Sequence, residues 1–238
     1  MPPRHWSLSM GAAGMSKWRE FATTDELDRA LARHLASRLE ADLKGRGTAS
    51  LAVSGGSTPT GMFQQLSRCS LDWTKVWLTL VDERQVARDS PDSNERLVRE
   101  HLLQNHASPA RFVGLAADPG EDPASLQQRL RAVPRPFTAV VLGMGSDGHT
   151  ASWFPGAANL PALLDPQGRA EVAATEPPTA AHRRITLTLP AILNSREIIL
   201  HLTGAAKKAV LEQASARAYP VATVLDQDRT PVTVWWTG

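Results

Sequence analysis

The sequence places a carboxylate and an imidazole two residues apart, at Asp147 and His149, within the glycine-containing segment Gly143–His149. An imidazole titrates near neutral pH, and a nearby carboxylate orients the ring and stabilises its protonated form. Such a pair can serve as a general base that takes a proton from water. The alternative is structural, with the Asp capping backbone amides and the His bonded to a carbonyl group.

The same segment also matches the dinucleotide-binding pattern G-x-G-x-x-G, through Gly143, Gly145 and Gly148. That pattern requires a helix that opens directly after the glycines, and a later acidic residue that binds the ribose. Here Asp147 and His149 crowd the position where the helix should open, and no second strand ends in a suitable acidic residue. The sequence therefore disfavours a dinucleotide site.

A second candidate loop is Ser54–Pro59, which reads Ser-Gly-Gly-Ser-Thr-Pro. Gly55 and Gly56 let the backbone turn tightly and approach a ligand closely, while Ser57 and Thr58 can cap the next helix or face a ligand. Free amides at the start of a helix attract anions, notably phosphate. Two interpretations stay open, an anion-binding loop and an ordinary junction between a strand and a helix.

Two cations follow other expected strands. Arg84 comes directly after Asp82 and Glu83 and offers a planar fork for phosphate or carboxylate. Its alternative is a surface ion pair with one of those two neighbours. Lys207 lies at a junction between a strand and a helix, where it can face a ligand while Lys208 points elsewhere. For Lys207 the alternative is a solvated first helical turn.

The remaining histidines and the single cysteine predict no metal site. No pair of histidines has the spacing of a zinc motif, and His201 lies in an apolar stretch typical of a core strand. Cys69 is the only cysteine, which excludes an intramolecular disulfide bond and favours a reducing compartment, the cytoplasm.

Apolar segments that alternate with helical patterns must position these residues. Thr23 and Glu26 form a capping box ahead of leucines spaced four apart. The patterns predict helices at 23–43, 92–104, 123–131 and 205–216, with a further helix starting near Pro59, and strands at 49–53, 76–81, 112–115, 137–142, 171–174, 185–188, 197–202 and 232–236. This order predicts an α/β fold, a Rossmann-like, mostly parallel sheet with helices on both faces. Ligands bind at the carboxyl ends of such strands, which selects loops 54–58, 82–84 and 143–149.

The length and charge of the chain limit the number of domains and the kinds of binding partner. The 238 residues carry 26 Lys and Arg against 24 Asp and Glu, a net charge of +2. We expect a flexible N-terminal lead at 1–16 and a single α/β domain at 17–238. No basic stripe suits nucleic acid, and no apolar run is long enough to cross a membrane. We therefore expect a small-molecule partner; the sequence does not predict an oligomeric state.

Taken together, the motifs resemble the 6-phosphogluconolactonase family, a group of lactone hydrolases. They occur in the family's order and span nearly the whole chain after the first helix. The matching segments are Ser54–Pro59, Asp82–Arg84 with Ser93-Asn94, Gly143–Ser152, Arg184–Thr188 and Thr203-Gly204-x-x-Lys207. One departure is Ser146, where the family often has Glu.

This resemblance implies a Rossmann-like fold, no metal or organic cofactor, and a phosphorylated sugar lactone as substrate. The implied reaction is the hydrolysis of 6-phospho-D-glucono-1,5-lactone in the oxidative pentose phosphate pathway. His149 is implied as the catalytic base, with Asp147 as its orienting carboxylate. The implied substrate-binding residues are Gly55, Gly56, Ser57, Thr58, Arg84 and Lys207, with Arg184 as a further cation.

The main alternative is an enzyme similar to glucosamine-6-phosphate deaminase/isomerase. That family typically has a Tyr after Asp-Glu and a Glu five residues after the loop histidine, where this chain has Arg84 and Phe154. A non-catalytic sugar-phosphate-binding regulator is a second alternative, against which the Asp147–His149 pair argues. A covalent serine hydrolase is disfavoured because Ser54 lacks the G-x-S-x-G elbow.

Overall fold

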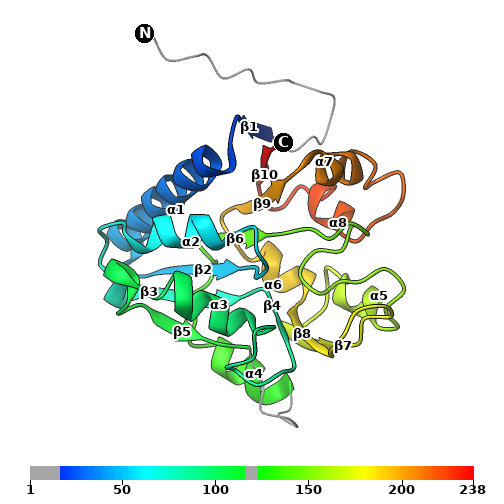
Figure 1. Cartoon of the computed structure of the whole chain (residues 1–238). Coiled ribbons are helices and arrows are strands. Elements are labelled where there is room, and N and C mark those ends of the chain that lie inside the picture. The colour runs from blue at the N-terminus through cyan, green and yellow to red at the C-terminus, as the bar shows by residue number, and fades with distance from the viewer. Residues whose placement is uncertain (1–16, 116–122) are drawn as a thin grey trace.

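A computed structural model describes residues 17–115 and 123–238 of the chain (Figure 1). The lead expected at 1–16 lies outside the described residues. The strands are β1 (Lys17–Phe21), β2 (Ala49–Val53), β3 (Val76–Leu80), β4 (Asp82–Arg84), β5 (Arg111–Val113), β6 (Ala139–Leu142), β7 (Val172–Thr175), β8 (Arg184–Leu187), β9 (Ile198–Thr203) and β10 (Val232–Thr237). The α-helices are α1 (Thr24–Arg46), α2 (Thr60–Ser67), α3 (Asn94–His101), α4 (Pro123–Leu130), α5 (Leu160–Leu163), α6 (Leu189–Leu193), α7 (Ala205–Glu212) and α8 (Ala222–Leu225). Two short 3₁₀ helices are η1 (Trp73–Lys75) and η2 (Asn105–Ala107).

The first helix shows how local sequence sets these bounds. The Thr23 hydroxyl accepts a 3.2 Å hydrogen bond from the amide of Glu26, which caps the helix start. Gly47 ends the helix with φ of +75°, a conformation that glycine adopts without a steric penalty, and its amide donates to the Leu43 carbonyl. The helix predicted at 23–43 is confirmed and extends three residues further. Among the described residues, no helix is long and apolar enough to span a bilayer.

In the part of the chain that the structure describes, seven strands form one sheet in the order β1-β10-β9-β6-β2-β3-β5. Every pair of neighbours in this sheet runs parallel. All residues of β2 and β6 are buried. Because successive side chains of a strand point to opposite faces, both faces of the sheet are covered. The predicted mostly parallel α/β sheet is confirmed.

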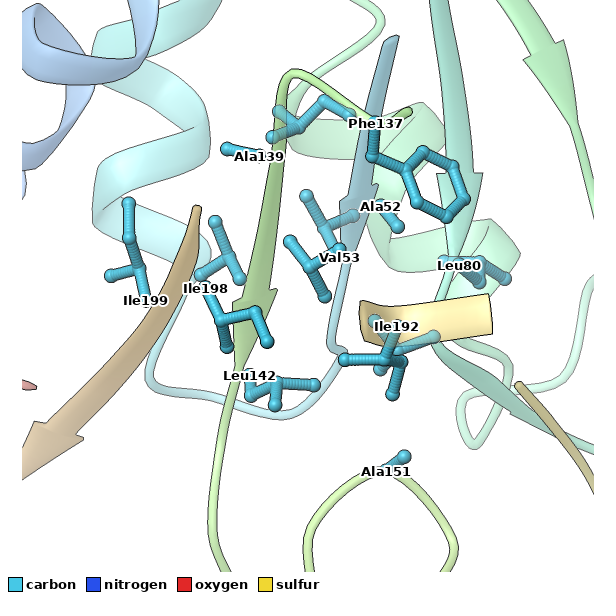
Figure 2. Close-up of a cluster of buried hydrophobic side chains, with 14 of the residues drawn as sticks. Ala52, Val53, Leu80, Phe137, Ala139, Leu142, Ala151, Ile192, Ile198 and Ile199 are labelled. Atoms are coloured by element: carbon cyan, nitrogen blue, oxygen red, sulfur yellow. The ribbon is translucent and has the colours of Figure 1, made fainter. Parts of the chain in front are cut away.

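The core fills the centre of this sheet. Figure 2 shows apolar side chains of β2, β6 and β9 gathered in one cluster, with Ile192 of α6 beside them. Val53, Leu142 and Ile199 are fully buried there. These strands therefore form a rigid base for the loops that leave their carboxyl ends.

The strand order reverses direction between β2 and β6. After β2 the chain builds outward through β3 and β5, whereas after β6 it builds the other way through β9 and β10. The loops that follow β2 and β6 consequently diverge and leave a crevice between them, which is where doubly wound sheets bind ligands.

A second sheet corrects the expected arrangement of three segments. β4, β8 and β7 pair antiparallel in a separate three-stranded sheet. The segment 82–84 was expected to end the strand that begins at Val76, but the chain leaves the large sheet after Leu80. Only eight residues, 176–183, join β7 to β8. That is too short for the crossover that a parallel pair requires, so the two strands pair antiparallel.

Candidate active site

A cavity of about 310 Å³ opens at the carboxyl ends of β2, β6 and β9, at the reversal of strand order. Its walls include loop 54–59, residues 143–145 with His149, and Thr203 with Lys207. The small sheet adds Asp82 and Arg84 to the lining. The cavity is therefore lined by residues from all three of the loops that were predicted from the sequence to bind a ligand.

His149 and Asp147 form the predicted pair. The Nδ1 atom of His149 lies 2.5 Å from the Oδ1 atom of Asp147, which also accepts a 3.2 Å hydrogen bond from the His149 amide. A carboxylate only accepts, so Nδ1 carries the proton, and in the neutral imidazole Nε2 keeps its lone pair. Burial works to raise the pKa of Asp147, but the charge and hydrogen bonds of His149 outweigh it and hold that pKa below its ordinary value.

Two glycines shape the turn that carries this pair. A Cβ atom at Gly145 would collide with the His149 ring and the Asp147 carboxylate. Gly148 has φ of +75°, and a side chain there would collide with the ring of Tyr219. The turn is closed by a 2.8 Å hydrogen bond from the Gly145 amide to the His149 carbonyl. Glycine is thus required for the pair to meet within so short a segment.

Loop 54–59 lies opposite this turn. Gly55 packs so closely on Asn94 that a Cβ atom would overlap its side-chain amide, and Gly56 adopts φ of +90°. The N-cap of α2 is Pro59, without a side-chain hydrogen bond. Within residues 17–115 and 123–238, neither Ser57 nor Thr58 forms a side-chain hydrogen bond, so the structure does not show the helix-capping alternative.

Arg84 lines the cavity, and its Nη1 atom donates a 2.6 Å hydrogen bond to the carbonyl of Asp92. The carboxylate of Glu83 is fully buried and does not accept from the Arg84 side chain. Instead it accepts from the Ser93 hydroxyl and from the amides of Arg84, Asn94 and Glu95. Glu83 therefore caps α3 and leaves the remaining guanidinium donors of Arg84 for a ligand.

The two adjacent lysines separate as predicted. Lys207 lines the cavity; burial lowers its pKa, and the negative charge of Asp147 partly opposes that shift. Lys208 instead forms a 2.6 Å ion pair with Glu20 and lies over the ring of Trp236. Only Lys207 of the two is therefore a candidate ligand-binding cation.

Arg184 does not line the cavity. It is buried opposite Arg84 in the β4–β8 register. Its Nη1 atom donates to the carbonyls of Ala181 and His182, at 2.6 and 2.9 Å. Burial lowers the pKa of its guanidinium, and the nearby positive charge of Arg84 lowers it further.

Sequence reasoning missed Asp82 and Asn94, which both line the cavity. The Ser152 hydroxyl donates a 2.6 Å hydrogen bond to Asp82, and the Asn94 side chain donates to the Asp82 carbonyl at 2.8 Å. The position of Asp82 directly beyond an apolar strand was an available signal. For Asn94, only its place inside the Ser93-Asn94 motif pointed to the site.

Within residues 17–115 and 123–238, no cluster of three or more His, Cys, Asp or Glu side chains is arranged to hold a metal ion.

His201 also reaches the cavity wall, although it is a buried core histidine, as predicted. Its Nε2 atom lies 3.5 Å from Oδ1 of Asp28 on α1. Neither ring nitrogen, nor that Asp28 oxygen, has a hydrogen-bond partner in the described part of the chain. Burial lowers the pKa of His201 to about 4. Burial, with repulsion from Asp25, raises the pKa of Asp28 to about 6 despite a hydrogen bond from the Met62 amide.

We expect Asp28→Asn to stabilise the protein at neutral pH. The pKa of Asp28 rises from 3.8 to about 6 on folding, so ionisation disfavours the folded state. This penalty is absent below pH 3.8, grows between 3.8 and 6, and is constant above. Asn keeps an acceptor for Met62 and removes the charge, so urea unfolding at pH 7.5 should show a gain of about 1–2 kcal/mol. The gain should vanish near pH 4; an equal change at both pH values would contradict this origin.

Comparison with known proteins gives consistent results. Residues 22–235 match the family model described as glucosamine-6-phosphate isomerases/6-phosphogluconolactonase. A 6-phosphogluconolactonase of Rhizobium meliloti is 43% identical over 223 residues, covering 91% of this chain and 96% of the relative. One of Mesorhizobium japonicum is 45% identical over 224 residues, covering 92% and 94%. The crystal structure of a 6-phosphogluconolactonase from Shewanella baltica has a TM-score of 0.90 and 49% identity, covering 94% of this chain and 100% of that one.

Proposed function

Since the chain belongs to the family of glucosamine-6-phosphate isomerases and 6-phosphogluconolactonases, we propose that its cavity hydrolyses 6-phospho-D-glucono-1,5-lactone to 6-phospho-D-gluconate. The chain is a lactone-hydrolysing enzyme of the oxidative pentose phosphate pathway. The observation that carries the proposal is the Asp147–His149 pair, whose imidazole lines a cavity that Arg84 and Lys207 also line.

In the proposed mechanism, Nε2 of His149 takes a proton from a water molecule as that water attacks the C1 carbonyl of the lactone. Asp147 holds the protonated Nδ1 and stabilises the imidazolium that forms. The tetrahedral intermediate then collapses with cleavage of the bond between C1 and the ring oxygen. His149 returns its proton to that oxygen, which becomes the free hydroxyl group of the open-chain acid.

The oxyanion of the intermediate needs hydrogen-bond donors, and we assign them to the backbone amides of loop 54–58. In the facing loop, the amide of Gly143 already donates to the Ser54 hydroxyl and the amide of Gly145 to the His149 carbonyl. The amides of Gly56 and Ser57 have no hydrogen bond within the described residues, and both residues line the cavity. Backbone donors of this kind stabilise developing charge without reorganising.

The phosphate group of the substrate is bound by Arg84 and Lys207, beside Gly55 and Thr58 of the same loop. Two half-buried cations attract a dianion strongly, because the wall of the cavity screens their charges less than bulk water does. Arg184 adds positive charge next to Arg84 without contacting the phosphate.

Arg84 and Phe154 also argue against the deaminase/isomerase alternative, since neither offers the acid that sugar ring opening needs. A regulator without catalysis would not need the free Nε2 lone pair beside a water-accessible cavity. The proposal further includes a single domain at 17–238 that works in the cytoplasm, which the single cysteine supports.

A proton-release assay on freshly prepared lactone tests the proposal. The enzyme should release acid from 6-phosphogluconolactone faster than the spontaneous reaction does. Its kcat/KM for this lactone should be at least about 100-fold greater than its kcat/KM for unphosphorylated gluconolactone, because two charge-assisted contacts are lost without the phosphate. Equal values for the two lactones would contradict phosphate docking. Tight binding of 6-phosphogluconate without any acceleration would instead support the regulator.

A further inference from the structure

The imidazole ring of His149 packs against the phenyl ring of Phe154. The ring centroids of His149 and Phe154 are 4.4 Å apart, with an angle of 34° between the ring planes. Phe154 is 5% exposed, whereas the His149 side chain is 29% exposed. A mostly solvent-shielded aromatic ring therefore packs against the more exposed imidazole.

Asp147 alone does not fix that imidazole. One hydrogen bond at Nδ1 sets the tautomer, but the ring reorients by rotation about the Cα–Cβ and Cβ–Cγ bonds, and the Asp147 side chain that accepts the bond is itself 44% exposed and can turn with it. A contact from a better-anchored group is needed to hold the plane of the ring. In the described part of the chain, Phe154 packs against the imidazole and supplies this contact.

The segment that carries Phe154 is firmly anchored. Ser152 donates its hydroxyl proton to Asp82 and its amide proton to Thr186 of β8. The indole of Trp153 is fully buried and donates a 2.8 Å hydrogen bond to the Leu187 carbonyl. Phe154 follows these two residues directly, so its ring rests on a part of the chain that has little freedom to move.

Phe154 also contacts Arg184, whose guanidinium carbon lies 5.9 Å from the centroid of the Phe154 ring. Two backbone carbonyls hold that guanidinium in place. The guanidinium of Arg184 is therefore a fixed neighbour of the Phe154 ring, within the range of a cation–π contact.

We propose that Phe154 is a positioning residue for the lactonase reaction, which holds the plane of the His149 imidazole so that Nε2 faces the cavity. This inference rests on the proposed role of His149. A change at Phe154 is therefore expected to affect kcat and not KM, because Phe154 does not line the cavity that would bind the phosphate.

The test compares Phe154→Leu with Phe154→Tyr. Leu keeps a buried apolar side chain but has no flat face, and Tyr restores the ring. We expect Leu to lower kcat by about 10-fold or more with KM within about twofold, since small displacements of a catalytic group are costly. We expect Tyr to recover most of that loss. The matched control is Phe137→Leu, which removes another buried phenyl ring. That ring lies two residues before β6 begins, and the guanidinium of Arg135 lies over it. This control variant should change the melting temperature but not kcat.

A measurement without substrate separates the inference from the proposed function. The carbon-bound ring protons of His149, assigned by their loss in His149→Asn, should show an upfield ring-current shift in the proton NMR spectrum. The shift should disappear in Phe154→Leu and persist in Phe154→Tyr. Unchanged kcat in Phe154→Leu, or equal losses in Leu and Tyr, would overturn the inference while leaving the function standing. Full activity of His149→Asn would instead overturn the proposed mechanism.

Discussion

Replacing His149 by Ala should lower kcat for 6-phosphogluconolactone hydrolysis by about 10²–10⁴-fold, the usual contribution of a general base. The loss follows from the contact with Asp147, which occupies Nδ1 and leaves Nε2 as the ring nitrogen that can accept a proton from the proposed attacking water. Affinity for the product 6-phosphogluconate, measured by calorimetry, should change by less than about threefold, because the residues proposed to bind the phosphate are Arg84 and Lys207. Stopped-flow proton release after mixing with fresh lactone measures the rate.

The kcat of the companion variant Asp147→Asn should lie between that of the wild type and that of His149→Ala. Asn cannot stabilise the imidazolium, and its amide nitrogen can donate to Nδ1, which favours the unproductive tautomer. Near-normal turnover in His149→Ala would remove His149 from the mechanism. A loss in Asp147→Asn that exceeds the loss in His149→Ala would show that the carboxylate acts on the substrate directly.

Replacing Arg84 or Lys207 by Met should reduce the preference for the phosphorylated lactone. A charge-assisted hydrogen bond contributes about 1.5–3 kcal/mol, so each change should lower kcat/KM for 6-phosphogluconolactone by about 10–100-fold, mainly through KM. The unphosphorylated lactone makes neither contact, so its kcat/KM should stay within about twofold. The ratio of the two values isolates the phosphate contacts from any effect on folding.

Lys208→Met is the matched control for this pair of variants. Lys208 is adjacent to Lys207 in sequence, but its ammonium group is engaged with Glu20 and Trp236, away from the cavity. It should leave the ratio unchanged. If Lys207→Met and Lys208→Met behaved alike, the effect of Lys207 would be one of overall charge and the docking model would fail.

Sequence patterns predicted the parts of the fold and site that depend on short segments. The leucine repeat and the capping residue Thr23 defined α1, and apolar runs defined the central strands. The Asp147–His149 contact was predictable because both residues lie in one glycine-rich turn, where spacing alone limits the geometry. The roles of these residues in catalysis stay predictions.

Features that depend on contacts between distant segments were not predictable. β1 has mostly exposed, charged residues and is a strand only because β10 pairs with it at the edge of the sheet. Asp82 and Asn94 reach the cavity because the chain leaves the large sheet after Leu80, which no periodicity signals. Arg184 looks like a free cation in the sequence, but the carbonyls that occupy its Nη1 atom come from a turn whose path depends on β8.

The hydrogen bond from the Gly143 amide to the Ser54 hydroxyl has a consequence for how the site meets its ligand. It joins the two loops that diverge at the reversal of strand order, and a second bond, from the Ser54 amide to the Val141 carbonyl, lies directly beside it. The two walls of the cavity are therefore tied at their base before any substrate enters. Such a preorganised pocket spends little binding energy on closing. Because these bonds form when the chain folds, the width of the cavity opening is fixed in the free protein. The size of the sugar that fits is therefore set before the substrate binds.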